Sequence, residues 1–166
     1  MDVHEKIFFN LISDEDDYPP VSTEAIWGVR VGAGEYKIDN VPAYIYGVSK
    51  GDVIKAEKID GESVAISVLH QGGHTTLRVF VEDKDLKAQV IKEIEALGGR
   101  CSVSSAFSLF SVDLPPEANF QAVDCYLEGL AQSGAIAYED ACLQHAGIDS
   151  QRLLEAMSLA TLGTRH

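Results

Sequence analysis

Histidine and carboxylate side chains are the groups in this sequence that could carry out acid–base chemistry or hold a metal ion. His70 ends one predicted strand and His74 begins the next, on either side of a short turn. Together with Glu24 or Asp39 they could form such a site, because imidazole and carboxylate groups both transfer protons and bind cations. Their spacing matches no zinc pattern, and no cysteine or third histidine is close in the sequence. We therefore expect no metal and no cofactor, and we keep Glu24, Asp39 and His74 as candidates for a cleft between two domains.

A run of four acidic residues is the second group that could bind a ligand or a partner. Asp14, Glu15, Asp16 and Asp17 are consecutive and precede a Tyr-Pro-Pro sequence, so we expect a loop. Calcium loops place carboxylates at alternating positions around a glycine, whereas consecutive side chains point in diverging directions. The run therefore predicts a solvated loop, or a contact surface for a basic partner, in preference to a metal site.

Two tyrosines follow this loop in the sequence. Tyr44 and Tyr46 are two residues apart, so they would share one face if the segment were extended. Aromatic side chains anchor many protein interfaces. We expect these two tyrosines and the acidic residues 14–17 to form a partner-binding surface.

The common signatures of enzymes are missing from the sequence. It contains no phosphate-binding loop, no GxSxG nucleophile elbow, no HExxH pair and no dinucleotide fingerprint. Cys101, Cys125 and Cys142 lie among apolar residues without CxxC spacing, which predicts reduced and buried thiols. These observations favour a binding protein over an enzyme.

Acidic residues outnumber basic ones throughout the chain. The formal net charge is −13, from 13 Lys and Arg against 26 Asp and Glu. Divided after Gly73, the first part has 13 acids and 6 bases (−7) and the second has 13 acids and 7 bases (−6). Nucleic-acid binding depends on clustered Lys and Arg, which no stretch supplies, so we expect no nucleic-acid partner. We also expect no membrane association and a cytoplasmic protein, because we find neither an apolar run of ~18 residues nor a secretory signal.

The pattern of turns and apolar residues predicts an α+β protein that begins with a β-rich domain. Residues 1–73 contain short β-prone runs separated by Gly, Asp and Pro, which is typical of a small antiparallel β-barrel or rolled sheet. One of these runs, residues 23–31, predicts a strand whose buried face carries Ala25, Trp27, Val29 and Val31.

The second part of the chain changes to a helical period. Residues 84–97 and 120–132 have apolar side chains at helical spacing, with predicted strands before, between and after them. This order, β-α-β-β-α-β over residues 74–145, is that of a ferredoxin-like domain. The C-terminal tail, residues 146–166, contains a predicted amphipathic helix that runs from Ser150 to residue 162, with Ser150 as its cap.

Several phrases of the sequence together resemble a known family. They are EAIW at residues 24–27, YKIDNVP at 36–42, YGV at 46–48, GDV at 51–53, GGHTTLRV at 72–79 and YE at 138–139. On these phrases, residues 5–142 are similar to an uncharacterised bacterial family described only as a domain of unknown function. Its members are usually small single-module proteins, so the resemblance implies a standalone bacterial cytosolic protein. It implies no activity, and Trp27 and Tyr36 have a structural interpretation as core residues of the β-rich domain.

The distributed negative charge, the lack of catalytic motifs and the small bacterial module lead to one main hypothesis. We expect an immunity- or antitoxin-type inhibitor that binds and occludes a cognate bacterial toxin, whose active domain is basic. Acidic side chains would take the place of the toxin's anionic substrate and speed association by electrostatic steering. Two alternatives stay open: a sensory module with a small molecule in the inter-domain cleft near His74, and an enzyme of another type that uses Glu24, Asp39 and His74.

Overall fold

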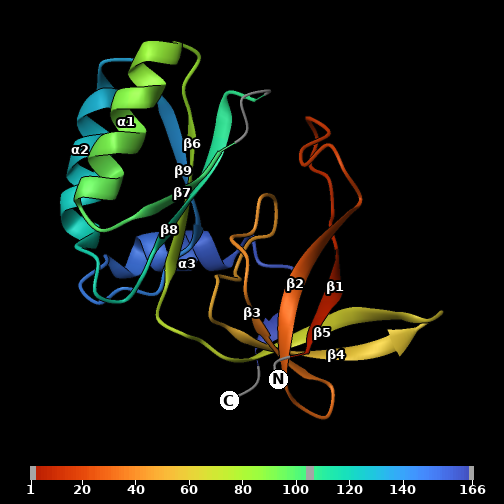
Figure 1. Ribbon diagram of the computed structural model, residues 1–166. Coiled ribbons are helices and arrows are strands. Elements are labelled where there is room, and N and C mark those ends of the chain that lie inside the picture. The colour runs from red at the N-terminus through yellow and green to blue at the C-terminus, as the bar shows by residue number, and fades with distance from the viewer. Residues whose placement is uncertain (1–2, 104–106, 165–166) are drawn as a thin grey trace.

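The computed structural model describes residues 3–103 and 107–164, and in these residues it contains ten strands and three helices. Figure 1 shows the elements gathered around two separate sheets, one of which is covered by two helices. Most neighbouring strands are antiparallel. The chain is therefore a mixed α/β protein with antiparallel sheets.

The first sheet is formed by the N-terminal part of the chain and is joined by its last described residues. Its strands lie in the order β1 (His4–Asn10), β2 (Thr23–Gly32), β3 (Glu35–Ile38), β4 (Val53–Ile59), β5 (Glu62–His70) and β10 (Gly163–Thr164). β1 also pairs with β5 in parallel, through Ile7 opposite Ser63 and Phe8 opposite Val64. This contact curls the sheet back on itself. Because it spans two residue pairs, the sheet is rolled and the predicted barrel is incomplete.

Strand β2 buries the face opposite to the one predicted from the sequence. Ile26 and Gly28 face the core, whereas Trp27 is 44% exposed and Val31 is also exposed. A Cβ atom on residue 28 would lie 3.0 Å from the Cβ of Tyr36, so glycine is what allows β3 to approach β2 so closely. Strand alternation defines two faces but does not say which one is buried. The predicted buried set, in which Trp27 and Val31 face the core, is therefore wrong.

The second sheet carries both of the longer helices on one face (Figure 1). Its strands lie in the order β7 (Arg100–Ser102), β8 (Leu109–Leu114), β6 (Thr75–Phe80) and β9 (Ala137–Cys142). α1 (Lys84–Ala96) follows β6 and α2 (Phe120–Gln132) follows β8, which is the order of strands and helices predicted from the sequence. The core between sheet and helices contains Leu77, Val79, Val90, Ile94, Val112, Val123 and Leu127.

Local signals account for the starts of these helices. The carboxylate of Asp83 accepts a hydrogen bond from the backbone N–H of Leu86 at 2.9 Å, which caps α1. The side chain of Asn119 caps α2 in the same way. The prediction of three buried cysteines is wrong for Cys125, which is exposed on α2.

α3 (Ser150–Met157) is shorter than predicted and is capped by a different residue. Asp149, not Ser150, is the N-cap, and its carboxylate accepts hydrogen bonds from two backbone N–H groups of the first turn, each at 3.1 Å. The helix ends at Met157 instead of residue 162 because the chain then turns to the first sheet and pairs with β5 as β10. The tail therefore connects the two sheets. Within the described ranges, no helix is both long enough and apolar enough to span a membrane.

Candidate functional site

The two sheets meet through polar side chains. Thr76 and Arg78 lie on the face of β6 that is turned away from the helices, and their side chains contact the segment 39–52 that joins β3 to β4. The hydroxyl oxygens of Thr76 and Ser49 lie 2.6 Å apart, and Ser111 of β8 donates to a carbonyl of the same segment at 3.0 Å. Part of the open face of the second sheet is therefore covered by a loop of the first.

Arg78 is 0% exposed at this junction. Its guanidinium donates a hydrogen bond to the carbonyl of Ile45, lies 4.9 Å from the ring centroid of Tyr46, and approaches a carboxylate oxygen of Glu139 at 3.5 Å. The hydroxyl of Tyr46 donates to the same carboxylate at 2.9 Å. Burial and the Glu139 carboxylate raise the pKa of Tyr46 well above its usual value. A cation removed from water needs partners of this kind, because burial takes away its hydration.

Asp52 forms a second polar connection between the sheets. One carboxylate oxygen accepts from the backbone N–H of Ser49 and the other from that of Gly72, each at 2.9 Å. The side-chain amide of Gln144 donates to both oxygens, at 2.9 and 3.0 Å. Burial raises the pKa of Asp52, although these hydrogen bonds oppose the rise. The carboxylate therefore holds three segments of the chain together.

Each of the three residues predicted for a cleft has partners of its own. His74 Nδ1 lies 2.8 Å from a carboxylate oxygen of Asp113, and Asp39 pairs with His4 at 3.1 Å. Glu24 accepts hydrogen bonds from three consecutive backbone N–H groups, those of residues 43–45, at 2.7, 2.8 and 3.1 Å. No described hydrogen bond or ion pair joins any two of the three predicted residues. In the structure, each of these three side chains holds a different segment in place.

The predicted partner-binding residues come together in part. Asp14, Tyr44 and Tyr46 line one cavity of about 100 Å³ with Tyr18 from the end of the acidic loop. We call this cavity the tyrosine pocket; its remaining lining residues are Leu11, Ile12, Pro19, Leu159 and Thr161. All four acids of the loop are exposed, Asp14 among them, and the segment that carries Tyr44 and Tyr46 is not a strand. The two tyrosines share a site because their segment, residues 39–52, packs against Arg78 and Glu24. Strand alternation is not the reason.

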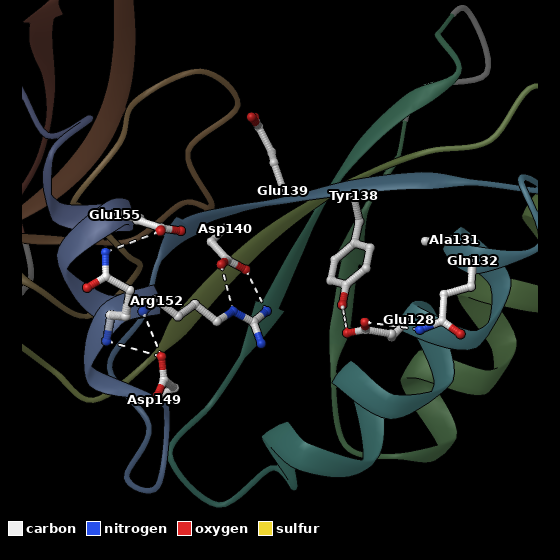
Figure 2. Close-up of a pocket in the computed structure, with 10 residues that line it drawn as sticks. Glu128, Ala131, Gln132, Tyr138, Glu139, Asp140, Asp149, Arg152 and Glu155 are labelled. Atoms are coloured by element: carbon white, nitrogen blue, oxygen red, sulfur yellow. Dashed lines mark hydrogen bonds and ion pairs between the residues drawn. The ribbon is translucent and has the colours of Figure 1, made fainter.

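A larger hollow of about 740 Å³ lies between α2, β9 and α3. Figure 2 shows Glu128 of α2 on one side of it, Asp149 and Glu155 on the other, and Asp140 of β9 between them. Its lining contains five carboxylates, from Glu128, Glu139, Asp140, Asp149 and Glu155, and one guanidinium, from Arg152, which leaves a formal charge of −4. We call this hollow the acidic groove.

Arg152 is already engaged and does not neutralise the rest of the groove. Its guanidinium donates to both oxygens of Asp140, at 2.7 and 2.8 Å, and to both oxygens of Asp124, at 2.8 and 2.9 Å. Hydrogen bonds with these two carboxylates raise the pKa of Arg152 further above its usual value. In the described part of the chain, no three His, Cys, Asp or Glu side chains form a group that could hold a metal ion. The groove is thus an anionic surface.

Sequence reasoning did not find the acidic groove. Its walls come from three elements that are separate in the sequence, and their distance from one another is set by the packing of α3 on β9. One signal was available: Asp124 and Glu128 are four residues apart in a helix whose bounds the sequence predicts, so they share one face. That spacing indicates an acidic helix face but says nothing of the second wall.

Comparison with known proteins adds a family and a related fold. A family model with the description "Domain of unknown function (DUF4265)" matches residues 24–138, which confirms the resemblance to such a family. A crystal structure of a hypothetical protein from Neisseria gonorrhoeae is similar, with a TM-score of 0.72 and 21% sequence identity. The similarity covers 86% of this chain and 96% of that one, and at this identity it concerns the fold alone. No curated protein matches the chain.

Proposed function

The chain belongs to the DUF4265 family, and we propose that it is an immunity- or antitoxin-type inhibitor that binds a basic protein domain and covers that domain's functional surface. One observation carries the proposal: the acidic groove presents carboxylates from α2, β9 and α3 around a hollow of about 740 Å³. A hollow with a negative net charge raises the local concentration of cationic partners and speeds their association. The partner that fits it is a segment rich in Lys and Arg.

The carboxylates that remain for a partner are those that Arg152 does not engage. Glu128, Asp149 and Glu155 stand on two walls of the groove, and their described hydrogen bonds are to uncharged groups of the protein itself. A basic segment between the walls can therefore pair with both sides. The inhibitor would act by occupying the cationic surface that its partner uses for an anionic substrate, as a competitor in the cytoplasm.

The architecture that presents this groove is also part of the proposal. We infer that β6 to β9 with α1 and α2 form a ferredoxin-like domain and that the first sheet forms a separate rolled β domain. The strand order β7-β8-β6-β9 and the position of both helices on one face support the first statement. α3 then adds the second wall of the groove to that domain.

The test is capture of a partner from the native host, followed by titration of the purified pair. We expect one stoichiometric basic protein whose affinity falls as salt is added, because added ions screen exposed charges. The double variant Glu128→Lys, Glu155→Lys should weaken binding by about tenfold or more, since like charges then oppose each other in the groove.

A matched control separates the groove from the total charge. The double variant Glu93→Lys, Glu95→Lys makes the same change in net charge on the exposed surface of α1. It should leave the affinity close to that of the wild type. Equal weakening by both double variants, or capture of no stoichiometric basic protein, would mean that the proposal is wrong.

A further inference from the structure

The tyrosine pocket is small. Its volume is about 100 Å³, against about 740 Å³ for the acidic groove. Three aromatic rings contribute to its wall, and the rings of Tyr18 and Tyr44 meet edge to face, with centroids 6.0 Å apart and planes at 71°. The pocket is therefore an aromatic enclosure for one small group and not a cleft for a large ligand.

The charges around the pocket favour a cation. The face of a tyrosine ring is negative, so aromatic enclosures attract ammonium and guanidinium groups. Asp14 stands in the lining, and the carboxylate of Glu139 lies against the hydroxyl of Tyr46. Burial and then the Glu139 carboxylate raise the pKa of Tyr18, so its ring keeps a neutral hydroxyl at physiological pH.

Arg78, a cation beside the pocket, is itself held on an aromatic ring. Arg78 lies over the ring of Tyr46 and is opposed by the carboxylate of Glu139 at 3.5 Å. With Arg78 counted as +1 and Glu139 and Asp14 as −1 each, the formal charge beside the pocket is −1. The contact between the Arg78 guanidinium and the ring of Tyr46 is of the same kind as the cation–π contact that we infer for a ligand.

The tyrosines are held in place before any ligand arrives. Glu24 fixes the backbone of Tyr44 through two of its hydrogen bonds, at 2.8 Å to Tyr44 and 3.1 Å to the next residue. Asp14 accepts a hydrogen bond from the backbone N–H of Tyr18 at 3.0 Å and thereby closes the turn of the acidic loop. A site that is already ordered loses less entropy on binding.

We propose that the tyrosine pocket is the anchor site for one lysine or arginine side chain of the basic partner. This inference rests on the proposed function and names the contact that would complete it. Glu139 joins the two sites, because it lines the acidic groove and accepts the hydrogen bond of Tyr46. Leu159 and Thr161, which follow α3, line the pocket, while α3 itself lines the groove. A basic segment in the groove can thus extend one cationic side chain into the pocket.

The inference can be tested on the full chain without any partner. The probes are N-acetyl-lysine methylamide, its arginine analogue and, as the uncharged analogue of lysine, N-acetyl-norleucine methylamide. Ring signals of Tyr18, Tyr44 and Tyr46 in a two-dimensional NMR titration should shift and saturate with the two cationic probes. The norleucine probe should bind about fivefold more weakly or worse, from the size of a cation–π contact.

Variants at the pocket locate the binding. Tyr44→Leu should weaken the cationic probes by about fivefold, whereas Tyr44→Phe keeps the ring and should bind like the wild type. Trp27→Leu removes an exposed aromatic residue outside the pocket and is the control. The unchanged spectrum of the remaining residues confirms that each variant is folded.

Two results overturn the inference. If the norleucine probe bound as tightly as the lysine probe, the pocket would be an apolar site. If no probe gave saturable shifts, the pocket would not be a binding site for these groups. Neither result depends on partner capture. A functional cation pocket in a protein that captures no basic partner would refute the proposed function and leave the pocket standing.

Discussion

Replacing Glu24 tests how much one carboxylate contributes to the stability of the fold, because it accepts hydrogen bonds from three consecutive backbone N–H groups. Oε1 accepts from Tyr44 and Ile45, and Oε2 accepts from Ala43. Glu24→Ala removes all three acceptors, and Glu24→Gln keeps one oxygen, which can still serve Tyr44 and Ile45. We therefore expect a graded loss of stability, with the glutamine variant between the wild type and the alanine variant.

The magnitude follows from the burial of the three donors. The N–H groups of Tyr44 and Ile45 are partly buried, while that of Ala43 is exposed and can bond to water instead. A hydrogen bond to a charged group is worth roughly 1.5–3 kcal/mol, and less where water can replace it. We expect Glu24→Ala to lower the free energy of unfolding by about 3 kcal/mol and Glu24→Gln to lower it by about 1 kcal/mol.

The measurement is urea unfolding followed by far-ultraviolet circular dichroism. An unchanged m-value with a lower midpoint shows that stability, and not the extent of unfolding, has changed. Glu57→Ala, an exposed glutamate inside β4, is the control and should stay within about 0.5 kcal/mol of the wild type. A glutamine variant that is as unstable as the alanine variant, or an alanine variant that matches the control, would refute the claim that the Glu24 carboxylate stabilises the fold through these hydrogen bonds.

Three further outcomes are expected. Asp52→Asn should lower the free energy of unfolding by about 2 kcal/mol, because both carboxylate oxygens accept from N–H donors and an amide nitrogen would face one of those donors. Burial raises the pKa of Asp52 in the folded protein, so the wild type should lose part of its stability as pH rises above 3.8. Urea unfolding at several pH values would detect this loss. Arg152→Gln should cost about 2 kcal/mol at neutral pH in the same assay. Burial alone would raise the pKa of Asp124, but hydrogen bonds from Arg152 and Tyr138 lower it, so this cost should shrink as pH falls below 3.8 through the lowered value. Trp27→Leu should lower the free energy of unfolding by less than about 1 kcal/mol, against about 3–5 kcal/mol for truncation of a buried aromatic residue. Because Trp27 is exposed, iodide should quench the fluorescence of the wild type.

The predictions that hold for this protein are those that depend on near neighbours in the chain. The spacing of apolar residues and a capping carboxylate define α1, and the bounds of α2 agree with the predicted helix at both ends. These signals lie within a few residues of one another, so no distant contact is needed to interpret them.

Distant contacts decided the features that sequence analysis missed. The exposure of Trp27 depends on which side of β2 meets the core, and the close approach of β3 at Gly28 settles it. The end of α3 depends on the pairing of β10 with β5, in which Gly163 lies opposite Ser67, 96 residues earlier in the sequence. Neither contact leaves a local pattern from which it could have been predicted.

The candidate sites divide in the same way. The sequence by itself determined that the surface is anionic, since −7 and −6 are carried by the two parts of the chain. Only the tertiary structure decided which carboxylates face a common hollow, which of them Arg152 takes up, and that Glu24 serves the backbone of the Tyr44 segment. The physical reason is that charge is a property of composition and adds along the chain, whereas a site depends on the positions of side chains from distant segments, which only packing and strand pairing determine.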